Sequence, residues 1–105
     1  MTADNSYSIG QVYDPTFDNL EHAIHAATMK QNVIAQNIAN AGNPDYAAMD
    51  FDAALDKAVK RANKKVNVEE ELAALSRNTI EHSAYVKLLA AKISVVRTVV
   101  TQGKK

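Results

Sequence analysis

Histidines with carboxylate neighbours are the first residues in this sequence that could do chemistry. His22 and His25 are three residues apart on a predicted helix, with Glu21 adjacent, so two imidazoles could face one metal ion. A structural metal site needs about four ligands, however, and the chain has no cysteine and only His82 as a further histidine. We therefore interpret the pair as part of a solvated helix surface and expect no metal and no cofactor.

His82 is the second candidate, because beside Glu81 it could act as a phosphoacceptor on a helical bundle. Its surroundings, TIEHSAYVK, lack a glycine for close approach, so a polar residue that fixes helix register is the favoured interpretation. Ser76 and Ser83 have no evident base at catalytic spacing. The sequence thus predicts no catalytic residues and a protein that is not an enzyme.

An acidic trio, Asp45, Asp50 and Asp52, could bind a hard cation. Its spacing does not follow a calcium-binding loop. Asp side chains at such positions more often accept hydrogen bonds from nearby backbone N–H groups, so we assign them to turns and caps.

The charge of the chain is divided between its two halves, although the net charge is zero. Residues 1–56 contain eight acidic residues and one basic residue, whereas residues 57–105 contain eleven basic residues and four Glu. The two halves should attract each other, within one chain or between copies. Because the acidic half would compete with nucleic acid for the basic half, the sequence disfavours nucleic-acid binding.

Length and composition limit the chain to one domain at most. The 105 residues include two Phe, no Trp and much Ala, and small apolar side chains suit close helix packing. The N-terminal sequence MTADNSYSIGQVYDP has neither the basic start nor the apolar run of a cleaved secretory signal. No stretch of about 18 apolar residues is present to span a membrane. We expect any export from the cytoplasm to follow a route that cleaves nothing.

Two long segments have the heptad spacing of paired helices. Asp14 and Pro15 are a favourable helix start, and Asn67 followed by Glu70 is another. In each segment apolar residues recur at steps of three and four. The seam residues that we expect to mediate assembly are Leu20, Ile24, Ile34, Ile38, Leu72, Leu75, Val86, Leu89, Ile93 and Val96.

The segment between the two helices is predicted to hold a turn and a third, short helix. Its apolar residues Phe51, Leu55, Ala58, Val59 and Ala62 could share one helix face, while lysines and Arg61 occupy the remainder. The predicted fold class is all-α, with long N- and C-terminal helices paired as an antiparallel coiled coil. The predicted organisation is a flexible segment (1–13), a coiled-coil helix (14–41), a turn and short amphipathic helix (42–66), and a second coiled-coil helix (67–105).

The C-terminal helix is predicted to be longer than its partner by about three turns. Folding back within one chain would leave part of its apolar seam uncovered, and Leu88, Ala91, Val95 and Val99 add a second apolar strip beside the first. Burial would then be completed by other subunits. The residues alone therefore predict an assembly protein.

The segment NIANAGNPDY, residues 37–46, resembles the signature of the flagellar axial proteins of the rod, hook and hook junction, which has the form Asn-x-Ala-Asn-x-x-Thr-Pro-Gly-Tyr. The matching residues are Asn37, Ala39, Asn40, Pro44 and Tyr46. Asn43 stands in place of Thr and Asp45 in place of Gly, and because Asp tolerates a left-handed backbone less well than Gly, the turn type is left open. Asn40 and Gly42 are expected to end the helix. The C-terminal run, with Asn78 and Tyr85 at its centre, is similar to the closing helix of proximal rod proteins of the basal body.

This resemblance implies a structural subunit of the flagellar basal-body rod that is not an enzyme. It implies terminal helices that line the axial tube, an uncleaved N-terminal signal for the type III export apparatus, and a periplasmic location. The implied partners are copies of the chain, other rod and basal-body proteins, and the export apparatus. The segment between the turn and the last helix, residues 47–66, is shorter than expected for the family. The alternatives are another rod subunit, a rod component of a related secretion system, and a small helical phosphotransfer or adaptor domain with His82 as phosphoacceptor.

Overall fold

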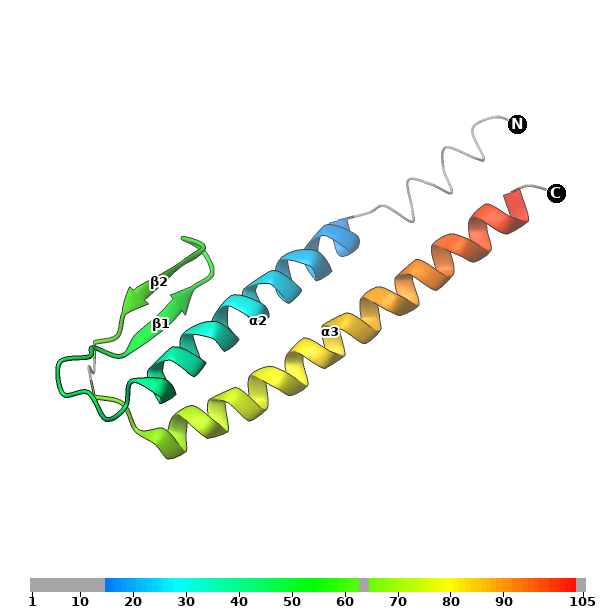
Figure 1. Ribbon diagram of the computed structural model, residues 1–105. Helices are drawn as coiled ribbons and strands as arrows, with labels where there is room; N and C mark the ends of the chain where they lie inside the picture. The colour runs from blue at the N-terminus through cyan, green and yellow to red at the C-terminus, as the bar shows by residue number, and fades with distance from the viewer. Residues whose placement is uncertain (1–14, 63–64, 104–105) are drawn as a thin grey trace.

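The computed structural model describes residues 15–62 and 65–103 of the chain. Two long helices, α2 (Pro15–Ala39) and α3 (Val68–Gly103), are connected through a small hairpin of strands β1 (Met49–Asp52) and β2 (Lys57–Lys60). The helices lie side by side and run in opposite directions, and the hairpin lies along α2 (Figure 1). The predictions for residues 1–13 and for the Asp14 cap lie outside the described residues.

α2 begins at Pro15 and ends at Ala39. Proline suits the first turn of a helix because the N–H group that it lacks has no partner there. At the other end the side-chain Nδ2 of Asn40 donates to the carbonyl of Gln36 at 2.8 Å, and its backbone N–H donates to the same carbonyl at 3.0 Å. Asn40 therefore ends the helix as predicted, but Gly42 does not act as a left-handed cap, because no described glycine has a positive φ.

Residues 49–60 form a β-hairpin, so the prediction of a short middle helix is wrong. The strands are antiparallel, with Met49 opposite Lys60 and Asp52 opposite Lys57. The protein is mostly helical with a two-stranded sheet, and the all-α class is corrected accordingly.

The hairpin turn shows why helical spacing misled here. Asp52 Oδ1 accepts from the N–H groups of Ala54 at 2.9 Å and Leu55 at 3.1 Å, which offers the backbone an alternative to helical hydrogen bonds. Asp56 then adopts a φ of 53°, a left-handed conformation that Asp reaches more easily than most residues. Apolar spacing over so few residues does not distinguish strand from helix.

α3 begins with the Asn67 cap that the sequence predicts. Asn67 Oδ1 accepts from the N–H of Glu70 at 3.2 Å, and its carbonyl accepts from the N–H of Glu71 at 2.9 Å. The 36 residues of α3 exceed the 25 of α2, and α3 continues past the first residue of α2 (Figure 1). Within the described residues, neither helix holds an apolar stretch long enough to cross a membrane.

The core is thin and partly polar. Among the described residues, the buried apolar side chains are Ala27, Val33, Ile34 and Ala48, and the buried polar ones are Asn37, Glu71 and Asn78. The largest fully buried side chains are therefore amides, and hydrogen bonds as well as apolar contacts hold α2, α3 and the hairpin together.

Candidate functional site: the polar junction and the outer face of α3

Asn37, the first residue of the NIANAGNPDY segment, is fully buried and makes four hydrogen bonds. Its Nδ2 donates to the carbonyl of Met49 at 2.8 Å and to Oε1 of Glu71 at 3.3 Å. Its Oδ1 accepts from the Tyr46 hydroxyl at 2.8 Å and from the Met49 N–H at 3.0 Å. Because an amide side chain has two N–H donors and two acceptor lone pairs, Asn37 is fully satisfied. One side chain thus ties α2 to β1 and to α3.

Arg61, which follows β2, completes this cluster from the other side. Its Nη1 lies 2.7 Å from Glu71 Oε1, its Nε donates to Asp50 Oδ1 at 2.9 Å, and its Nη2 donates to the Met49 carbonyl at 3.3 Å. Glu71 is 3% exposed, and a buried carboxylate is costly unless it is paired. The hydrogen bond to Glu71 in turn raises the pKa of Arg61 above its ordinary value. We call Asn37, Tyr46, Arg61 and Glu71 the polar junction.

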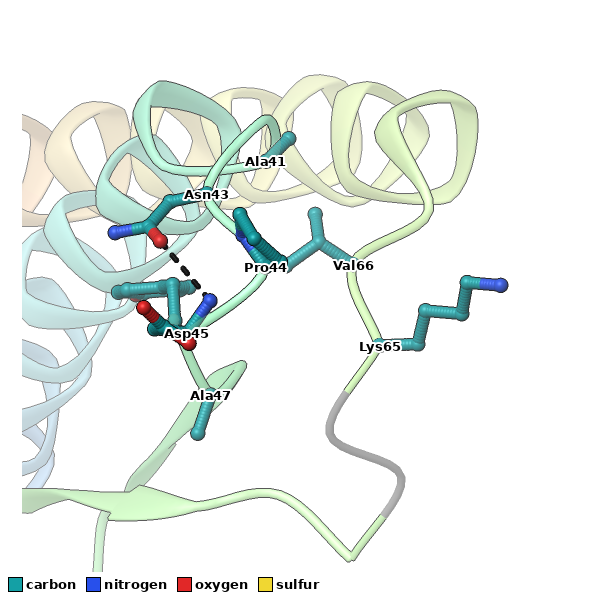
Figure 2. Close-up of a pocket in the computed structure, with 8 residues that line it drawn as sticks. Ala41, Asn43, Pro44, Asp45, Ala47, Lys65 and Val66 are labelled. Atoms are coloured by element: carbon teal, nitrogen blue, oxygen red, sulfur yellow. Dashed lines mark hydrogen bonds between the residues drawn. The ribbon is translucent and has the colours of Figure 1, made fainter.

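The two positions that depart from the family signature form a turn stabilised by the Asn43 side chain (Figure 2). Asn43 Oδ1 accepts from the N–H of Asp45 at 2.9 Å, and the Asn43 carbonyl accepts from the N–H of Tyr46 at 3.1 Å. Asp45 does not need a glycine conformation, since Asp56 alone among the described non-glycine residues has a positive φ. Asn and Thr can both accept such a bond through a side-chain oxygen, so Asn43 replaces Thr with its chemistry retained.

The five matching positions of the signature differ in what they contact. Asn37 and Tyr46 are bonded to each other inside the polar junction, and Asn40 closes the helix. Ala39 and Pro44 are exposed. The signature therefore encodes how the chain leaves α2 and reaches β1, with Tyr46 directed back to the helix.

A cleft of about 570 Å³ lies beside this turn. Pro44, Lys65 and Val66 are among the residues that line it (Figure 2), and so is Tyr46. It separates the exit from α2 from the segment that leads into α3, so the two connections of the hairpin to the helices lie on either side of it.

The predicted seam residues of α2 lie on its inward side. Ile34 is buried, and Leu20, Ile24 and Ile38 are half-buried. This side of the helix packs against α3 and the hairpin.

On α3 the predicted seam residues divide into two sets. Leu75, Leu89 and Val96 are half-buried. Leu72, Val86 and Ile93 are instead exposed, by 50%, 43% and 37% respectively. Within this chain the second set does not pack into the contact between the helices, and its role in assembly stays a prediction.

Polar side chains occupy the places that the second set was expected to fill. Glu71 and Asn78, seven residues apart, are buried, and Glu71 directly precedes the seam residue Leu72. Glu71 is bonded to Asn37, and Asn78 Nδ2 donates to the carbonyl of Ala27 at 2.8 Å. These partners offset the cost of burying polar side chains, while Leu72, Val86 and Ile93 remain partly exposed.

Little in the sequence indicates Arg61 and Glu71 as junction residues. Arg61 belongs to a run of basic residues typical of a solvated helix face, and Glu71 is one of the acidic residues in the first turn of α3, where the helix dipole favours negative charge. Their pairing depends on a contact between β2 and α3 that no local pattern records.

The residues considered above for metal binding and phosphotransfer lie at the following positions in the structure. His25 Nε2 lies 2.7 Å from Asp56 Oδ1 and connects α2 to the hairpin turn, while His82 is half-buried on α3. Asp50 pairs with Arg61 and Asp52 caps the hairpin turn. Over residues 15–62 and 65–103, no three His, Asp or Glu residues are grouped in a way that could hold a metal ion.

No family model matches the chain, and comparison with known proteins finds a relative by sequence. The chain is similar to the flagellar basal body rod protein FlgB of Bacillus subtilis (strain 168), with 28% identity over 127 residues that cover 89% of this chain and 98% of the relative. The alignment is longer than the 105 residues of the chain, so the relative contains residues that this chain lacks. The family resemblance inferred from residues 37–46 and from the C-terminal helix is thereby confirmed. Over most of its length the chain is similar to a flagellar basal-body rod protein.

Proposed function

We propose that this protein is a structural subunit of the proximal flagellar rod and assembles with copies of itself through its two long helices. The observation that carries the proposal is the outer surface of α3, which exposes large apolar side chains along its whole length. These residues are Val68, Leu72, Ile80, Val86, Leu88, Ile93, Val95 and Val100. Apolar surface of this extent on so small a chain is typical of a face that other subunits cover. The similarity to a rod protein indicates which assembly is involved.

In the assembled rod, α2 and α3 pair as an antiparallel coiled coil, and the helix pairs of neighbouring copies surround a central export channel. The polar junction fixes the hairpin to the helix pair, so that force on the outside of the subunit is transmitted to the tube wall. The partners are copies of the chain, other rod and basal-body proteins, and the type III export apparatus. The N-terminal segment carries the uncleaved export signal, and the rod crosses the periplasm.

Replacement of Ile93 by Asp tests this function. Ile93 is 37% exposed, so a carboxylate there remains partly solvated in the isolated chain but would be buried without a partner in an assembly. We expect Ile93→Asp to abolish incorporation into basal bodies and swimming. The adjacent exposed residue provides a matched control, Ser94→Asp, which should incorporate normally. Normal swimming of the Ile93→Asp strain would refute the proposal.

Leu89→Asp is a second test of the proposed function. Leu89 is half-buried on α3 and belongs to the half-buried set of seam residues. This variant should also fail to incorporate, but it should lose helical content before assembly. Circular dichroism of the purified chain separates the two causes of failure.

A further inference from the structure

The hairpin of β1 and β2 is fixed firmly to the helices at its base. The Met49 N–H and carbonyl both bond to the Asn37 side chain, at 3.0 Å and 2.8 Å. Beside them, the Arg61 N–H donates to the Ala48 carbonyl at 2.9 Å, and the Arg61 guanidinium pairs with Glu71. Asn37, Ala48 and Glu71 are buried, so these contacts form in a low-dielectric environment that strengthens them.

The turn of the same hairpin is held less firmly. In this turn, Asp56 Oδ1 lies 2.7 Å from His25 Nε2 of α2. The His25 and Asp56 side chains are 54% and 64% exposed, and ion pairs at such exposure contribute little to stability. His25 and Asn37 are twelve residues apart on α2, which is about 18 Å at 1.5 Å per residue. The two attachments of the hairpin are therefore well separated and unequal in strength.

Two clefts lie where the hairpin meets α2. Their volumes are about 350 Å³ and about 260 Å³. Ala26 of α2, Phe51 of β1 and Ala53 of the turn line both of them. Because Ala26 is short and Phe51 is only half-buried, the outer part of the hairpin packs on α2 with little apolar contact. Segments with few buried apolar contacts open at a low free-energy cost.

We propose that residues 49–60 form a hinged arm, whose turn lifts away from α2 while its base at Met49 and Arg61 stays closed. The pair of His25 with Asp56 is the latch of this arm. When the arm is closed it covers the α2 surface around Ala26, and when it is open that surface is accessible to other molecules. The latch thus controls access to one face of the helix pair. The arm does not depend on the proposed function, because its contacts lie within one chain.

Thiol labelling tests the arm, because the chain has no native cysteine. Full-length Ala26→Cys is treated with a maleimide that carries a polyethylene glycol chain, which is too bulky to enter either cleft. We expect slow labelling, at a rate that follows the population of the open arm. Adding His25→Ala should raise this rate about two- to fivefold, the effect of one exposed ion pair. His22→Ala, at the same cleft, is the matched control and should leave the rate unchanged.

Asp56→Asn is a second latch variant, made from the other side of the pair. Asn tolerates the left-handed φ of 53° at this position, so the turn is retained while the charge is removed. The labelling rate of Ala26→Cys should rise in this variant as well, by less than with His25→Ala, because the Asn oxygen can still accept a hydrogen bond from His25.

Two reporters show which part of the molecule moves. Ala27→Cys lies next to Ala26 but at a buried position, so its labelling should stay slow when His25→Ala is added. The N–H groups of Met49 and Arg61 report on the base of the arm. Their hydrogen exchange, measured by NMR, should also be unaffected by His25→Ala. All comparisons are made between variants whose circular dichroism shows the helical content of the wild type.

Each other result overturns a stated part of the proposal. Labelling of Ala26→Cys as fast as that of Ala35→Cys, at an exposed position of α2, would show that the arm does not cover the helix. An unchanged rate with His25→Ala would show that the pair is not a latch. Faster labelling of Ala27→Cys would indicate separation of the helices instead. Faster exchange at Met49 and Arg61 would indicate that the whole hairpin detaches, which excludes a hinge at its base.

Discussion

Replacement of Asn37 by Ala tests whether the polar junction holds the fold together. The change removes four hydrogen bonds, but the groups left behind are not equally affected. Glu71 and the Met49 carbonyl keep their bonds to Arg61, and the half-buried Tyr46 hydroxyl can turn to water. The Met49 N–H loses the partner that Asn37 provided. With about 0.5–1.5 kcal/mol for the lost bond to Tyr46 and about 1–3 kcal/mol for the unsatisfied Met49 N–H, we expect a loss of about 1.5–4.5 kcal/mol.

Urea unfolding followed by circular dichroism measures this loss as a fall in the midpoint concentration. The matched control is Asn32→Ala, the same substitution at an exposed position of α2. The control should be neutral or stabilising by a few tenths of a kcal/mol, because Ala favours helix more than Asn does. If Asn37→Ala and Asn32→Ala unfold at the same urea concentration, the hydrogen bonds of Asn37 do not contribute to stability and the junction does not have the role assigned to it.

Three further substitutions test other parts of the junction by the same unfolding measurement. Arg61→Met leaves the Glu71 carboxylate buried without its cation and should lower the free energy of unfolding by about 3–5 kcal/mol. Glu71→Gln in the same chain should restore part of that loss, and no restoration would contradict the pairing of Arg61 with Glu71. Tyr46→Phe removes one bond to Asn37 and should cost about 0.5–1.5 kcal/mol, so a loss as large as that of Asn37→Ala would be inconsistent with this account. Asp45→Gly restores the residue of the family signature and should destabilise by about 0.5–1 kcal/mol, since Asp45 has no positive φ here; a gain in stability would show that the turn prefers glycine.

The long helices could be predicted from sequence because their signals are local and repeated. Pro15 at the start of α2, Asn40 at its end and Asn67 at the start of α3 act where the sequence placed them. Each depends on bonds between residues a few positions apart, and such bonds leave a readable pattern. The family signature was readable for the same reason, since its turn is formed by Asn43 and its near neighbours.

The hairpin could not be predicted in this way, because what favours it lies outside the segment. Met49 is held through both its N–H and its carbonyl by Asn37, and Arg61 joins the end of β2 to Glu71 of α3. These contacts span twelve residues or more in most cases and do not alter the local apolar spacing. Tertiary contacts therefore decided a segment whose own pattern fits either a strand or a helix.

The division of the predicted α3 seam into half-buried and exposed residues could not be predicted for a related reason. Heptad spacing predicts which residues share one side of α3 but not which side contacts α2. The apolar side was the expected choice for that contact. The choice was overridden by Glu71 and Asn78, whose buried partners lie on α2 and at the hairpin. Hydrogen bonds form in only one geometry, whereas apolar side chains can pack in several. Polar contacts at these positions therefore specify the register of α2 against α3 more strictly than apolar contacts would.

The same division between buried polar and exposed apolar residues links the fold to the proposed assembly. Had Leu72, Val86 and Ile93 packed against α2, the helix pair would have a thicker apolar core and fewer apolar side chains outside it. With Glu71 and Asn78 in that place, contacts within the chain depend on hydrogen bonds, and the apolar residues are available to a neighbouring copy. A chain built in this way gains most of its apolar burial when it joins other subunits, so its helices should be more stable in the assembled rod than alone. This can be tested by comparing the hydrogen exchange of the α3 amides between the isolated chain and the rod. Assembly should slow exchange most around residues 86–100. Equal exchange in both states would contradict this division between polar contacts within the chain and apolar contacts between copies.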